Sequence, residues 1–461
     1  MPYPTIEAFG QLLYSLIQYD RATAHHTVAP IMTRLKPNHF TAILLASAVP
    51  LLALSSISAR SAGFVWLLIS LAGIVAWISD KARPSTQTQS HLHPALPAAQ
   101  WWLLACCAAF LLMAIPTAYW GGPWSERHPQ WRLMIGASGL WLLLRHSAPS
   151  VRMVQAMATA VAVSCLLAYG LVMTSGSSAA PTNRIPWMAG LALLSCTLLI
   201  LCYSMQNASI RLRQFWLAAS AVMLVTALIS GVRGSWPLLL IWPLMLWRLH
   251  GSAPQLWARC WKWILPLLAV LLAVGLHVIP EADNPTARIT AVLQETGATL
   301  TGTAMSQDTS SGVRLALYEL GISNVLNHPL LGLGPIRTKQ LIKGELASIG
   351  AYSQLAAIGH MHNDLLHPWM EFGLFGLAGY LAYAAGMVVA AWHLCRTAAH
   401  HGFNIGLIAL LVMHLSTGMS NMNFAHNYYP LMLALSTALV ILGCQGQATE
   451  TPSSSSENSS C

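Results

Sequence analysis

The sequence predicts an all-α membrane protein with about twelve transmembrane helices, and three observations support this. Only 8 % of the 461 residues are charged and 55 % are hydrophobic, whereas about 25 % charged residues are usual in a soluble domain. Mean hydropathy is +0.56. Apolar stretches of about 17–25 residues recur along the chain, which is the length that crosses a bilayer. An unpaired backbone group in lipid costs several kcal/mol, so we expect these stretches to be helices.

Nine of the apolar stretches precede a long polar insert and three follow it. The fourth and the eighth are short. Their expected positions are near 40–58, 62–79, 100–119, 133–147, 153–174, 186–205, 214–231, 235–250, 262–279, 368–394, 403–420 and 428–446.

The distribution of Lys and Arg predicts the orientation. If the N-terminal segment 1–39 is cytoplasmic, the short loops on that side hold most of the basic residues, as the positive-inside rule requires. The insert 280–367 then lies outside the cytoplasm, and the Ser- and Glu-rich segment 447–461 is a disordered cytoplasmic tail. The first 39 residues lack the charged and apolar regions of a cleavable signal peptide. The formal charge of +9 does not indicate a nucleic-acid partner, because the basic residues are scattered and form no basic face.

The insert should be a helical cap over the bundle. More than half of the chain's 14 Asp and Glu residues lie between 280 and 379, and none of its nine Cys lies in 280–366. Apolar residues at spacings of three and four predict helices over Pro285 to Leu300 and Gly312 to Leu326. Two such helices are too few for an independent soluble domain.

The strongest local pattern is His362-Asn363, then nine residues, then Gly373-Leu374-Phe375-Gly376. A neutral imidazole accepts a proton near neutral pH, and Asn363 or Asp364 could cap the helix of the tenth stretch. Glycines at every third position from Gly373 allow close helix packing. The alternative is an interfacial His beside an ordinary capping Asn.

Three histidines also have a spacing that a metal site could use. His360, His362 and His367 lie close together, but zinc needs three or four ligands. No Cys is near, and Asp364 and Glu371 are the closest carboxylates. The pattern therefore favours a site without a metal.

Several arginines could bind an anion. Arg233 follows the seventh stretch, close to the membrane. A guanidinium there is costly unless it binds an anion such as a phosphate. The alternative is that the Arg233 side chain only extends to the membrane interface. Arg314 lies on the second expected helix of the insert, one turn from Tyr318, and could instead face solvent. Arg288 and Arg337 add positive charge to the same compartment.

In this order the motifs resemble the O-antigen ligase family, within the superfamily of O-antigen ligases, polymerases and bacterial O-oligosaccharyltransferases. The similar architecture is about twelve spans, with one large periplasmic loop between the ninth and tenth. Leu377 stands where the family has a small residue. The matching elements are Ser230-Gly231-Val232-Arg233-Gly234, the Arg314 helix with His328-Pro329-Leu330-Leu331-Gly332-Leu333-Gly334, and His362-Asn363-x9-Gly373-x-x-Gly376.

The resemblance implies an enzyme of lipopolysaccharide biosynthesis in a Gram-negative inner membrane. It would move O-antigen polysaccharide from undecaprenyl diphosphate to lipid A-core, with inversion and without a metal or other cofactor. His362 would be the general base or would orient the acceptor, and Arg233 and Arg314 would hold the diphosphate. The catalytic loop 280–367 would lie between transmembrane parts 40–279 and 368–446. We expect substrate contacts from Arg288, Tyr318, Arg337, His360 and Asn363.

Two alternatives remain open. A protein O-oligosaccharyltransferase or an O-antigen polymerase would share these residues. A transporter of a lipid-linked substrate would need ionisable residues at mid-span and repeat symmetry, and the stretches contain almost no mid-span charge.

Overall fold

A computed structural model gives the arrangement of most of the chain, and every regular element that it describes is a helix. This confirms the all-α prediction for those residues. The structure describes residues 37–81, 95–121, 130–147, 149–175, 184–249, 254–278, 290, 293–294, 297, 310–348, 359–396, 401–419, 421–426 and 428–443.

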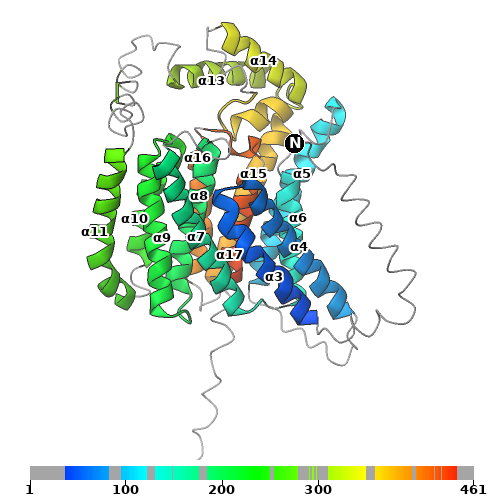
Figure 1. Cartoon of the computed structure of the whole chain (residues 1–461). Helices are drawn as coiled ribbons and strands as arrows, with labels where there is room; N and C mark the ends of the chain where they lie inside the picture. Colours follow the sequence, from blue (N-terminus) through cyan, green and yellow to red (C-terminus); the bar gives the residue numbers. More distant parts are fainter. Residues whose placement is uncertain are drawn as a thin grey trace, which may run out of the picture.

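Twelve of the described helices form one bundle, and each coincides with one of the twelve expected stretches (Figure 1). Short 3-10 helices η1 (Leu54–Ser56), η4 (Arg233–Ser235) and η8 (Asn423–Ala425) lie between them. The bundle helices are α3 (Pro37–Ala53), α4 (Ala59–Lys81), α5 (Leu96–Trp120), α6 (Gln130–His146), α7 (Val151–Ser175), α8 (Arg184–Ser204), α9 (Ile210–Ile229), α10 (Leu238–Leu249), α11 (Pro254–Val278), α15 (Leu366–Arg396), α16 (His401–Gly418) and α17 (Tyr429–Gly443).

The bundle is built as a membrane domain. Seven helices are long and apolar enough to cross a membrane by length and composition: α3, α4, α5, α7, α8, α9 and α15. Shorter apolar segments lie in α11, α16 and α17, and neither group includes α6 or α10, the two short stretches. Helix α8 is almost wholly buried at the centre, while large apolar side chains such as Leu111, Leu240 and Trp247 are exposed on the outside. The chain is therefore a multi-pass membrane protein.

Two further helices lie across one end of the bundle (Figure 1). We call α13 (Ser310–Asn327) and α14 (Pro335–Ser348) the cap. Helix α13 confirms the helix expected over Gly312 to Leu326. The helix expected over Pro285 to Leu300 lies outside the described residues except at four positions, and so does the tail at 447–461.

The cap has an apolar core of its own, separate from that of the bundle. This core joins α13 and α14 to the start of α15, so the cap is anchored on α15. Its buried members are Val313, Leu317, Val325, Leu333, Ile342, Leu346, Met361, Leu366 and Met370.

Candidate active site

The second and third motifs of the sequence meet at a break in α15. Gly373 has a φ of 61° inside this helix, which interrupts the helical hydrogen bonding. The segment His328–Gly334 lies in the gap, and its Leu331 carbonyl also accepts a hydrogen bond of 2.9 Å from Trp120 Nε1 at the end of α5. Three backbone hydrogen bonds join the motifs: Leu333 N–H to Met370 O at 3.0 Å, Gly334 N–H to Glu371 O at 2.9 Å, and Leu374 N–H to Pro329 O at 2.7 Å.

Replacing Gly373 by Ala should destabilise this junction. A Cβ there would overlap the carbonyl of Leu330, and a non-glycine residue with this φ is strained by about 1–3 kcal/mol before that overlap. We expect a clear drop in the apparent Tm of the purified protein in detergent. Gly344→Ala, in the middle of α14 with open space around it, is the matched control and should leave Tm equal or slightly higher. Equal Tm values for both variants would contradict the role given to Gly373.

His362 lies in a tight turn just before α15. Its φ of 52° makes it the one residue other than glycine with a positive φ in the described ranges. Tyr318, on α13, holds the turn from the cap side: its hydroxyl donates to the His362 carbonyl at 3.3 Å and to the Met419 carbonyl at 2.8 Å. The turn is thus fixed between the cap and the loop that follows α16.

Asn363 caps the start of α15 and is one of the two cap residues that the sequence offers. Its Oδ1 accepts from the backbone N–H of Leu365 at 2.9 Å and of Leu366 at 2.8 Å, the pattern of an N-cap. Its Nδ2 donates to the Met419 carbonyl at 3.3 Å. Asn363 therefore orients the helix and also ties the His362 turn to the loop after α16.

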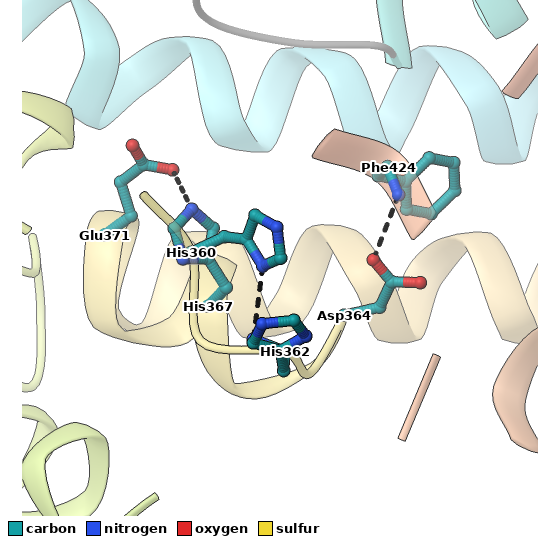
Figure 2. A network of polar contacts seen from close by, with 6 residues as sticks. All are labelled: His360, His362, Asp364, His367, Glu371 and Phe424. Atoms are coloured by element: carbon teal, nitrogen blue, oxygen red, sulfur yellow. Dashed lines mark hydrogen bonds and ion pairs between the residues drawn. The ribbon is translucent and has the colours of Figure 1, made fainter. Parts of the chain in front are cut away.

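Asp364, the other candidate cap, has a different role. It is 1 % exposed, its N–H donates to the Gly418 carbonyl at 2.7 Å, and its Oδ1 accepts from Phe424 N–H at 3.1 Å (Figure 2). Burial raises the pKa of this carboxyl well above its usual range, despite backbone hydrogen bonds that lower it. Asp364 therefore fastens the turn to the end of α16 and to η8.

Four histidines gather around the turn. Figure 2 shows His360 beside His362, whose backbone N–H donates to His360 Nδ1 at 3.4 Å; the ring centroids are 4.5 Å apart. His426 lies 5.9 Å from His360, centroid to centroid, and His367 Nε2 is 3.3 Å from a carboxylate oxygen of Glu371. Across the described residues, no group of three or more His, Cys, Asp and Glu side chains is arranged to hold a metal ion.

The imidazole of His362 is held neutral. Its pKa is lowered to about 4: burial has the largest effect, the positive charge of Arg314 and the ring of His426 act in the same direction, and a hydrogen bond to Asn421 acts against them. Burial also lowers the pKa of His360 well below its usual range, with added repulsion from His362, and lowers that of His426 to about 4. At neutral pH, His362 can therefore accept a proton.

The structure brings together most of the predicted site. Arg314 on α13 is close enough for its charge to act on His362 and Tyr318, and His360 and Asn363 adjoin His362. Arg233 lies in η4, which packs against α8 and α16. Arg337 is exposed on α14. Arg288 lies outside the described residues.

The loop between α16 and α17 is the part of the site that the sequence prediction missed. Met419, Asn421, Phe424 and His426 all contact the His362 turn or its neighbours. A signal was present: this short loop is rich in Asn and His between two apolar helices. Such residues also form ordinary turns, so they did not point to a site.

Comparison with protein families finds a match that spans part of this site. The family model described as O-antigen ligase matches residues 218–381, from the second half of α9 to the middle of α15. This range contains Arg233, Arg314, Tyr318 and His362 and ends before the loop after α16. No curated protein matches the chain.

Proposed function

From the match of residues 218–381 to the O-antigen ligase family model, we propose that the chain transfers O-antigen polysaccharide from undecaprenyl diphosphate to lipid A-core. The observation that carries the proposal is the imidazole of His362, held in a fixed turn within reach of the positive charge of Arg314. A base and a cation side by side are what a hydroxyl attacking a sugar diphosphate requires.

The proposed reaction is a displacement at the anomeric carbon. The acceptor hydroxyl oxygen forms a bond to this carbon as the bond from carbon to the diphosphate oxygen breaks, with inversion. His362 takes the hydroxyl proton, which is worth typically about 10²–10⁴-fold in rate. The diphosphate leaves with the electron pair, and Arg314 and Arg233 stabilise its charge. In this scheme no step needs a metal.

The location follows from the same scheme. A polyprenyl donor lies in the bilayer, and the bundle presents exposed apolar faces to it. The basic residues of the short loops favour a cytoplasmic N-terminus. We therefore place 280–367 in the periplasm as the catalytic loop, with the bundle in the inner membrane. Substrate contacts from Arg288 and Arg337 remain part of this proposal.

The acceptor defines the alternatives. If the acceptor is a hydroxyl of a protein, the chain is an O-oligosaccharyltransferase. If the acceptor is the end of a growing glycan, the chain is a polymerase. Both keep the roles of His362 and Arg314. A transporter fits less well, because the described polar cluster of His360, His362 and His426 lies before α15 and between α16 and α17, outside the bundle helices.

The decisive experiment is glycan transfer by the purified protein in detergent with EDTA. Undecaprenyl-diphosphate glycan is the donor, and lipid A-core, a Ser-containing peptide and the donor glycan itself are offered as separate acceptors. We expect an unchanged rate in EDTA and product on lipid A-core. Product on the peptide or a lengthened glycan would replace the acceptor and keep the chemistry. Absence of transfer to all three would overturn the proposed function.

A further inference from the structure

Helix α14 packs against the turn that holds His362. Ile342 and Leu346 lie one turn apart on its buried face, and both belong to the same apolar core as Met361. Met361 is 0 % exposed and stands between His360 and His362 in the chain. The core of the cap therefore holds both histidines beside this face of α14.

Lys339 reaches the same turn along its aliphatic stem. A Cβ on Gly359 would lie 3.2 Å from Lys339 Cγ, 3.3 Å from Cε and 3.6 Å from Cδ, so the three heavy atoms nearest to this position all belong to Lys339. Three consecutive carbons of the stem thus lie along Gly359, the residue before His360. The ammonium is one bond beyond Cε, and this places it at the turn. Lys343, one helical turn later on α14, provides none of these atoms.

The ammonium of Lys339 is available to a ligand. Lys339 is exposed, and within the described ranges it makes no hydrogen bond or ion pair. The carboxylates close to the turn already have partners: Glu371 lies 3.3 Å from His367 Nε2, and Asp364 accepts from Phe424 N–H at 3.1 Å. An anion that enters beside the turn could therefore accept from this ammonium without displacing a described contact.

A second cation reaches the turn from the other helix of the cap. Tyr318 on α13 donates from its hydroxyl to the His362 carbonyl at 3.3 Å. Arg314 lies four residues earlier on α13, and residues four apart share a helix face. The turn is thus approached by Arg314 from α13 and by Lys339 from α14. Two cations that converge from different helices suit a ligand with more than one anionic oxygen.

We propose that Lys339 binds a phosphate group of a substrate beside the turn that carries His360 and His362. The inference rests on the proposed function and names the chemical group that this cation contacts. An ammonium donates strong, charge-assisted hydrogen bonds to phosphate oxygens. Two groups have this chemistry: the diphosphate of the donor and a phosphate ester on the acceptor.

Protection of Lys339 from acetylation tests the inference without a transfer step. The full-length protein in detergent is treated with sulfo-NHS acetate, and the acetylation rates of Lys339 and Lys343 are measured by peptide mass spectrometry. Both lysines are exposed on α14, so Lys343 is an internal control. We expect a substrate that carries the phosphate to slow acetylation of Lys339 by about fivefold or more at concentrations well above Kd. Acetylation of Lys343 should not change.

The choice of ligand separates the two sources of phosphate. Protection by undecaprenyl diphosphate would assign Lys339 to the donor. Protection by lipid A-core that is lost when its phosphates are removed would assign it to the acceptor. Absence of protection by both ligands, or equal protection by phosphatidylglycerol, would overturn the inference. Protection in a protein that transfers no glycan would support the inference and contradict the proposed function.

Substitution of Lys339 gives a kinetic readout of the same contact. Lys339→Ala should raise the KM for the substrate that carries the phosphate by about tenfold, with little change in kcat, because a charged hydrogen bond to the bound substrate is lost. Lys339→Arg should restore most of the affinity, and Lys343→Ala should match wild type. If Lys339→Ala transferred glycan with an unchanged KM for both substrates, the inference would be wrong and the proposed function would stand.

Discussion

Replacing His362 by Asn should lower kcat for glycan transfer by about 10²–10⁴-fold, with little change in the KM for the donor. Asn is the matched choice because it tolerates the φ of 52° at this position. The loss follows from removal of the base, while the cap and the turn keep their hydrogen bonds through the main chain. The measurement is steady-state transfer in detergent with equal amounts of folded protein.

His328→Asn is the control for this prediction, because His328 is an exposed histidine near the cap. Its rate should match wild type. A His362→Asn rate within about threefold of wild type would show that His362 is not the general base, since loss of the base is expected to lower the rate far more.

Replacing Arg314 by Ala should lower kcat by about 10²–10³-fold, the size of effect seen when one charge-stabilising donor is removed. A second effect is specific to this site: the guanidinium lowers the pKa of His362, so its loss should raise that pKa. On acidification, the transfer rate of the variant should therefore begin to fall at a higher pH than the rate of wild type. Arg314→Lys should recover part of the rate, because it restores the charge without the planar fork.

Lys343→Ala serves as the charge-matched control, because Lys343 is exposed on α14. Its rate and pH profile should equal those of wild type. If Arg314→Ala and Lys343→Ala had the same rate and pH profile, the effect of Arg314 would come from its positive charge alone. Its position near His362 would then not affect the transfer rate.

The sequence was sufficient to predict the bundle and one cap helix. Each apolar stretch must bury its backbone polar groups in a helix, so hydropathy alone located all twelve helices. Asn363 was predictable as a cap because an Asn before an apolar helix has few other roles. Helix α13 followed from its apolar spacing.

The contacts of the site were not predictable to the same extent. Gly373 was expected to allow close helix packing, but it breaks α15 and accommodates the Leu330 carbonyl. That junction depends on Leu330, 43 positions earlier in the chain, which local spacing does not encode. Asn421 and Asn423 lie still farther along the chain, and a short polar loop gives no indication of which helix end it will contact. Pairing at long range had to come from the structure.

The shared core of the cap has a consequence for biosynthesis. Helices α13 and α14 are translated before Met361, Leu366 and Met370, which complete their apolar core. The cap therefore cannot close when it leaves the translocon, and it must wait until α15 has entered the membrane. The loop after α16 is made later still and adds the last contacts to His362. A nascent chain stopped before this loop would present a cap without a formed active site, so transferase activity should arise only after the last helices are inserted.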